Sequence, residues 1–262
     1  MSRMSRSKIK NFLLLKQIHT AVSQIKKGNL DKALETLDKA ENSARKAKST
    51  DGLYYILFTR GGILYTAAKY DDALETYEKA LAAGDELLKS DPESIDYQHY
   101  MGTTLSNTGN LLKKKGENDR AAESYSCARE IYTRLIVQDP KNVVFRSYAG
   151  ENLNNYAALL IETGSFEEAC RLLKEAIEIY EKLLEESPEN PGYQAELSVA
   201  LSNLGSCLIH QAPENSDAEN NTTAKKNLEK ALSMQENLLA QQPENEKMKE
   251  DLELTRKRLE KL

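Results

Sequence analysis

The chain has 262 residues and a formal net charge of −5; 40% of its residues are hydrophobic and 29% are charged. With no tryptophan, 12 glycines and 6 prolines, this composition is typical of a helix-rich globular protein. The longest apolar run near the start, FLLL at 12–15, is too short for a membrane span or a signal-peptide core. We therefore expect a cytoplasmic protein with no membrane partner.

The charge is unevenly distributed. Residues 1–30 carry seven Lys or Arg and no acid, which leaves the rest of the chain at −12. A basic segment of this kind can contact nucleic acid, a membrane surface or an acidic partner, but a disordered basic tail followed by a solvated helix face explains it equally well. Because the rest of the chain has no basic face, the sequence does not favour a nucleic-acid partner.

Internal repeats organise the chain. Pro92, Pro140 and Pro188 lie 48 residues apart and close the apolar segments LLKSDP, LIVQDP and LLEESP. LLAQQP repeats the pattern at Pro243, seven residues late, and the extra residues lie in the polar insertion APENSDAENN at 212–221. Five related units are predicted. In chain order they span residues 8–48, 52–92, 94–140, 142–190 and 192–243.

Each unit resolves into two amphipathic helices, as the third unit illustrates. An apolar stripe with spacing i, i+3, i+4, i+7 runs from Leu105 to Leu112 and predicts a first helix over about 95–115. The same spacing predicts a second helix over about 118–138. That helix ends before Pro140, because proline disfavours helical geometry in the preceding residue.

The last residues, 244–262, predict a capping helix. They carry twelve charges in nineteen positions and have one apolar side. The members of that side are Met248, Leu252, Leu259 and Leu262. Just before the fifth unit's second helix, NNTT at 220–223 is interpreted as the cap of a helix that begins at Thr223.

One position in every first helix holds a small residue. The members are Ala21, Gly61, Gly109, Ala157 and Gly205. Glycine inside a helix costs roughly 1 kcal/mol relative to alanine. We therefore expect two helices to approach each other closely at this position.

The pattern resembles the tetratricopeptide repeat, with its signature W-x2-L-G-x2-Y, then A-x3-F, then P. The first half is matched in the fifth unit by Leu201, Leu204, Gly205 and Leu208. The second half is matched in the second unit by Tyr70, Ala73, Tyr77 and Ala80. Leucine replaces the tryptophan, and Arg60 and Thr108 occupy positions where an apolar residue is expected, so we expect looser packing there.

The resemblance is to a long-helix variant of the family, because the period of 48 exceeds the usual 34 or so by about two turns per helix. It implies an all-α, right-handed α–α superhelix of about five helical hairpins plus the capping helix, forming one solenoid domain over residues 1–262. The kinesin light chain is similar in this respect.

Three asparagines recur at one position of successive first helices, in TLSNTG, NLNNYA and ALSNLG. At 100° per residue, Asn107 points about 150° away from the buried stripe of its helix. The resemblance implies that first helices line a concave groove, and that asparagine at this position bonds the backbone of a bound peptide in relatives such as the kinesin light chain. An amide offers both donors and an acceptor for that purpose. The predicted groove residues are Asn107, Asn155, Asn203, Asn110, Lys114, Thr59, Ser206 and His210.

Two other interpretations of the asparagines remain open: hydrogen bonds between neighbouring repeats, and inheritance from a duplicated unit.

The sequence shows no phosphate-binding loop, nucleophile elbow or metal-ligand spacing, so we expect no enzyme, no cofactor and no metal. Cys127, Cys170 and Cys207 lack C-x-x-C spacing and are expected to be buried, reduced thiols.

The predicted function is a non-catalytic protein-interaction scaffold that binds an extended peptide segment of a protein partner in its groove. The alternative is a structural subunit that forms homo-oligomers through the solenoid edges or terminal helices. A third interpretation, an enzyme or nucleic-acid regulator acting through residues 1–30, has less support. The identity of the partner does not follow from the repeat, since a fold describes a mode of recognition only.

Overall fold

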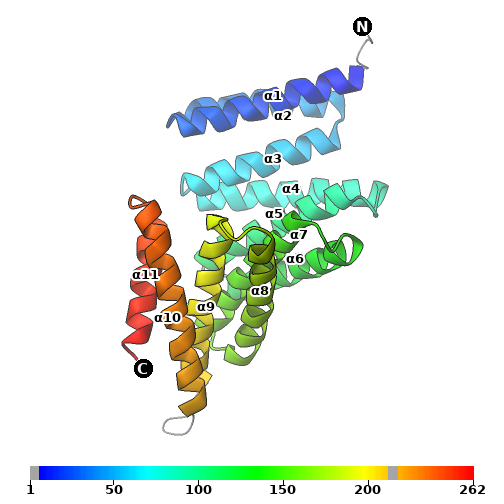
Figure 1. Ribbon diagram of the computed structural model, residues 1–262. Helices are drawn as coiled ribbons and strands as arrows, with labels where there is room; N and C mark the ends of the chain where they lie inside the picture. Colours follow the sequence, from blue (N-terminus) through cyan, green and yellow to red (C-terminus); the bar gives the residue numbers. More distant parts are fainter. Residues whose placement is uncertain (1–5, 212–217) are drawn as a thin grey trace. The chain divides into compact units, whose positions relative to one another are not determined.

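The structure is a computed structural model that describes residues 6–211 and 218–262 (Figure 1). Within these residues the chain forms eleven α-helices and no strand, which confirms the all-α prediction. No helix in this part of the chain is long and apolar enough to cross a membrane. The helices divide into two compact units, Met1–Glu117 and Asn118–Leu262.

The first unit contains five helices. They are α1 (Arg6–Lys26), α2 (Leu30–Ala47), α3 (Thr50–Thr66), α4 (Tyr70–Ser90) and α5 (Ile95–Lys114). Each helix packs on the next, and the first helices α1 and α3 also touch each other. The core between α1, α2 and α3 includes Leu37, Ala40 and Ile56, all fully buried. These contacts make α1/α2 and α3/α4 the two predicted hairpins of this part of the chain.

The second unit contains six helices. They are α6 (Asn118–Gln138), α7 (Val143–Glu162), α8 (Phe166–Glu186), α9 (Pro191–Gln211), α10 (Ala218–Gln241) and α11 (Glu246–Leu259). Consecutive helices pack on each other, and α9 also contacts both α7 and α11. The helices α7, α9 and α11 therefore form one layer, with α8 and α10 as hairpin partners. The terminal helix α11 takes the place expected of the cap.

The turns inside the hairpins follow the repeat. Gly116 and Gly164 have a left-handed backbone conformation, with φ of 75° and 82°, which glycine adopts at little cost. At the equivalent position of the second hairpin, Ala68 adopts φ of 57° although it carries a Cβ. The turn of the second hairpin therefore holds alanine in a left-handed backbone conformation that is unfavourable for a residue with a Cβ.

The small position of the first helices is a point of close helix approach, as predicted. A Cβ on Gly61 would lie 2.5–2.9 Å from the ring of Tyr77, and one on Gly205 would lie 2.6 Å from Leu228. Ala21 and Ala157 are fully buried at the equivalent positions. The partner helix therefore fills the space that a larger side chain would need.

Three expectations are wrong. Cys127 is exposed, because it lies on the outer face of α6, whereas Cys170 and Cys207 are buried. Helix α10 begins at Ala218 instead of Thr223, so NNTT at 220–223 is already helical. Leu262 lies beyond the end of α11 and is exposed, so it is not part of the apolar side of the cap. The first six residues of the polar insertion, 212–217, lie outside the described residues.

Candidate functional site

The predicted asparagines belong to both units: Asn107 to the first, Asn155 and Asn203 to the second. In the second unit they lie on α7 and α9, which are in contact. Asn155 is half-buried, and Asn203 is buried, with 7% of its surface exposed. Within residues 6–211 and 218–262, the side chains of Asn155 and Asn203 have no hydrogen-bond partner. The Asn155 amide is therefore available to a ligand.

Asn107 differs from the other two because its side chain is engaged. It hydrogen-bonds the hydroxyl of Tyr77 on α4, the second helix of the preceding hairpin. Burial raises the pKa of the Tyr77 hydroxyl, and the bond to Asn107 acts in the opposite direction. At this site the asparagine links neighbouring repeats, which is one of the interpretations that the sequence left open.

Lys114 and His210 share one structural relationship, 96 residues apart. The Lys114 ammonium lies 5.2 Å from the centre of the Tyr70 ring, a cation–π contact. The His210 ring stacks on Phe166, with 4.9 Å between ring centres. In both cases a residue at the C-terminal end of the first helix of one repeat packs on a residue at the start of the second helix of the preceding repeat. Part of each side chain is therefore used in packing, and contact with a ligand remains a prediction.

The remaining predicted groove residues are Thr59, Asn110 and Ser206. The Thr59 hydroxyl donates to the Tyr55 carbonyl at 2.8 Å, a bond inside its own helix. Asn110 is half-buried, and Ser206 is buried. Their role in binding likewise remains a prediction.

The structure brings together three polar residues that sequence reasoning did not select: Glu151 and Asn154 on α7, and Glu196 on α9. The Asn154 amide Nδ2 donates to the Glu196 carboxylate Oε2 at 3.0 Å and to the Glu196 carbonyl at 3.1 Å. Glu151 lies one turn before Asn154 and Asn155 on the same helix. The spacing of Glu151 and Asn154 along one helix can be found in the sequence. The contact of α7 with α9 that brings Glu196 next to Asn154 cannot.

The two carboxyl groups of this cluster are destabilised in their charged form. Desolvation and the nearby Glu196 raise the pKa of Glu151 to about 7. Desolvation also raises the pKa of Glu196, against which the Asn154 hydrogen bond acts, and Asp251 on α11 raises it further. Glu151 as a residue is exposed. A positive charge placed here would be stabilised by both carboxylates.

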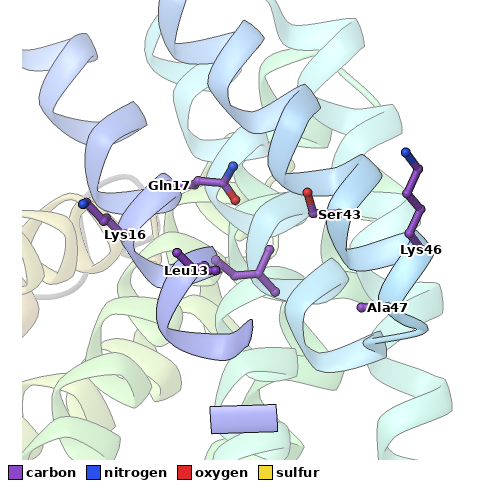
Figure 2. A pocket seen from close by; sticks show the side chains of 7 residues that line it. Leu13, Lys16, Gln17, Ser43, Lys46 and Ala47 are labelled. Carbon is purple, nitrogen blue, oxygen red and sulfur yellow. The ribbon is translucent and has the colours of Figure 1, made fainter. Parts of the chain in front are cut away.

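A separate cavity of about 390 Å³ lies between α1 and α2 in the first unit (Figure 2). Its lining comprises Leu13, Leu14, Lys16, Gln17, Ser43, Lys46 and Ala47. Figure 2 shows Leu13, Lys16 and Gln17 on one helix and Ser43, Lys46 and Ala47 on the other. None of the predicted groove residues lines it. Among the described residues, no group of three or more His, Cys, Asp or Glu side chains could hold a metal ion.

Comparison with known proteins identifies the repeat in part of this chain. Residues 153–191 match the family model described as tetratricopeptide repeat. This match confirms the resemblance to the tetratricopeptide repeat seen in the sequence. This fold supports a role as a protein–protein interaction scaffold. None of the curated proteins compared with the chain matches it.

Two solved structures are similar to the chain over most of its length. One is BtubC (BKLC) from P. vanneervenii, 19% identical over 86% of this chain and 92% of that chain, with a TM-score of 0.58. The other is a putative kinesin light chain from Podosopora anserina with nearly identical TPR-like repeats, 17% identical over 85% of this chain and 94% of that chain, with a TM-score of 0.59. At these identities the likeness shows a shared solenoid fold.

Proposed function

We propose that the protein is a non-catalytic scaffold, acting in the cytoplasm, whose first-helix face binds an extended peptide segment of a protein partner. The observation that carries this proposal is the Asn155 amide, half-buried on α7 and without a hydrogen-bond partner in the described part of the chain. An amide in this state can donate to a peptide carbonyl and accept from a peptide N–H. It would hold the backbone of a partner whatever its side chains.

The position of the asparagine supports this proposal. Asn155 and Asn203 recur at one point of two first helices that touch each other, so their amides repeat along one layer. Repeat proteins bind partners along extended surfaces created by such stacking. Asn107 belongs to the other unit, where its bond to Tyr77 gives it a structural role as well.

The experiment compares the wild-type full chain with Asn155→Ala in a quantitative pull-down from lysate of the native cells. Partners retained by the wild type and lost from Asn155→Ala are then tested as overlapping synthetic peptides by fluorescence anisotropy. We expect one extended segment to bind, with affinity reduced about tenfold by the substitution, as for loss of one or two hydrogen bonds. Equal binding of every partner segment by both proteins would contradict the proposal.

Tyr77→Phe is the matched control for the structural interpretation. It removes the hydroxyl that Asn107 bonds and leaves Asn155 untouched. If the repeated asparagines serve only to link repeats, Tyr77→Phe and Asn107→Ala should both lower stability, and Asn155→Ala should change neither stability nor binding. If Asn155 reads a peptide, its substitution changes binding without a change in the thermal midpoint.

A second candidate function, self-association through a terminal helix, is favoured by two exposed leucines of α1. Leu13 and Leu15, on either side of the buried Leu14, are 54% and 56% exposed. Exposed leucines on an edge helix of a solenoid leave apolar area that a second copy could cover. Light scattering over a hundredfold concentration range tests this function: a mass that rises with concentration, and that Leu13→Ser with Leu15→Ser keeps monomeric, would support it.

A further inference from the structure

Two buried cysteines meet where α8 packs on α9. Cys170 lies on α8 and Cys207 on α9, and both belong to one buried cluster, with 4% and 0% of their surfaces exposed. The Cys207 thiol donates to the Phe166 carbonyl, with 3.0 Å between Sγ and the oxygen. In an α-helix the same carbonyl accepts the backbone N–H four residues later, which here belongs to Cys170. The Cys207 sulfur therefore lies at the turn of α8 that ends in Cys170.

Further contacts place the two sulfur atoms side by side. The backbone N–H of Cys170 donates to the Cys207 sulfur, and the two thiols hydrogen-bond each other. The register of the helices agrees with these contacts, because the ring of His210, one turn after Cys207, stacks on the ring of Phe166, one turn before Cys170. The cysteines thus form a dithiol pair that bridges two helices.

The two thiols of the pair differ in acidity. The hydrogen bond from Cys207 lowers the pKa of the Cys170 thiol against the effect of burial, and the Lys174 ammonium, one turn further along α8, lowers it as well. The same hydrogen bond and burial raise the pKa of Cys207. Because the thiolate is the nucleophilic form of cysteine, Cys170 is the sulfur that reacts first.

Cys170 is also the member of the pair that a small reagent can reach. It lines an open cavity of about 1060 Å³, together with Arg171 and Lys174 of the same helix. Cys207 is fully buried against it. A thiol of lowered pKa at a cavity, with a second thiol in contact, is the arrangement of an oxidisable cysteine and its resolving cysteine.

We propose that Cys170 and Cys207 are a modification site at which hydrogen peroxide forms a disulfide between α8 and α9. The Cys170 sulfur attacks one peroxide oxygen and the O–O bond breaks, which gives a sulfenic acid; the leaving hydroxide takes the Cys170 proton and becomes water. The Cys207 sulfur then attacks the Cys170 sulfur, the S–O bond breaks, and the leaving hydroxide takes the Cys207 proton. Two thiols are oxidised by two electrons, and one peroxide is reduced to two waters.

The disulfide would join two helices that are otherwise held by packing alone at this point. Cytoplasmic thiol reductants reverse such a bond, so in that compartment the modification would be transient, as redox-sensing disulfides are. The site does not depend on the proposed peptide-binding function. Asn155→Ala should form the disulfide as readily as the wild type, so the failure of either proposal leaves the other standing.

The test uses the full chain with Cys127→Ser, which removes the exposed thiol that could join two molecules. The reduced, folded protein is treated with a small molar excess of hydrogen peroxide, denatured in N-ethylmaleimide and analysed by mass spectrometry. We expect neither remaining cysteine to be labelled, a tryptic product that joins Cys170 to Cys207, and full labelling of both after dithiothreitol.

Two further variants, made in the Cys127→Ser chain, separate the roles of the two thiols. Cys207→Ser should stop at the sulfenic acid, which dimedone then traps on Cys170. Cys170→Ser should leave Cys207 reduced under the same conditions. Full labelling of both cysteines after peroxide treatment of the folded protein, or a disulfide that forms only in urea, would overturn the proposal. Dimedone labelling of Cys207 in Cys170→Ser, as fast as that of Cys170 in Cys207→Ser, would overturn the assigned order of reaction.

Discussion

Arg60 on α3 forms an ion pair with Asp38 on α2, with 2.6 Å between the guanidinium and the carboxylate. The arginine side chain is 16% exposed, and Glu41 lies 3.3 Å away as a second partner. The repeat pattern expects an apolar residue at position 60. The aliphatic part of the arginine can supply that packing while its charged end reaches the acids of the preceding helix.

Arg60→Ala should lower the free energy of unfolding by about 1–2 kcal/mol, because it removes both the packed stem and the partly buried ion pair. Arg60→Leu should cost less, since a partly buried ion pair contributes little more than a well-packed apolar side chain. Urea denaturation of the three proteins measures both values. An equal loss for leucine and for alanine would show that the charge itself, and not the packed stem, holds α3 on α2.

Gly61→Ala should destabilise the fold by about 1–3 kcal/mol, as overpacking of a close helix contact does. The added Cβ would meet the ring of Tyr77 at 2.5 Å. The fourth sequence repeat, residues 142–190, suggests the compensating change. There Ala157 takes the place of Gly61 and Leu173 the place of Tyr77, and both lie in one buried cluster. In a double-mutant cycle, Tyr77→Leu should therefore recover much of the loss caused by Gly61→Ala. Purely additive losses would mean that the ring is not the obstacle.

Much of this fold follows from the sequence, because helix periodicity and turn residues act locally. The helix predicted over 118–138 is α6, and the one predicted over about 95–115 is α5. A repeat supplies the same stripe, turn and terminal proline several times, so one clear unit defines the others. The start of α10 was misplaced by five residues because asparagine and threonine are good caps and also tolerated helix residues.

The candidate site could be predicted only in part. The position of Asn155 follows from periodicity, but its free amide and the bond of Asn107 to Tyr77 depend on which residue the neighbouring helix brings opposite. The same holds for Glu196 and Asn154, which are 42 residues apart and meet through the packing of α7 on α9. Cys127 shows the related limit that a small, weakly polar side chain does not reveal which face of a helix is buried.

Ala68→Gly should stabilise the protein by about 0.5–1 kcal/mol. The alanine has a left-handed backbone, which disfavours a residue with a Cβ by about 1–2 kcal/mol, and glycine recovers part of that cost after its larger loss of entropy on folding. Gly28, Gly116 and Gly164 already occupy the equivalent turns. Gly116→Ala is the reciprocal control and should destabilise by a similar amount. No change in urea midpoint for Ala68→Gly would mean that the turn is held by other contacts.

The pH dependence of stability should contain a contribution from Glu151. Its pKa in the folded protein is about 7, above the ordinary value of 4.5, so the folded state holds a proton that the unfolded state has released. The stability that comes from this proton is complete below about pH 4.5 and is lost as the pH rises through 7. Glu151→Gln keeps the hydrogen-bonding shape of the neutral acid without the ionisation. The variant should therefore match the wild type near pH 5 and exceed it in stability near pH 8, as measured by urea denaturation at both values. Glu178→Gln, which removes one exposed charge from α8, should parallel the wild type at both pH values. A Glu151→Gln variant that does the same would show that the Glu151 carboxyl is not crowded in the folded protein.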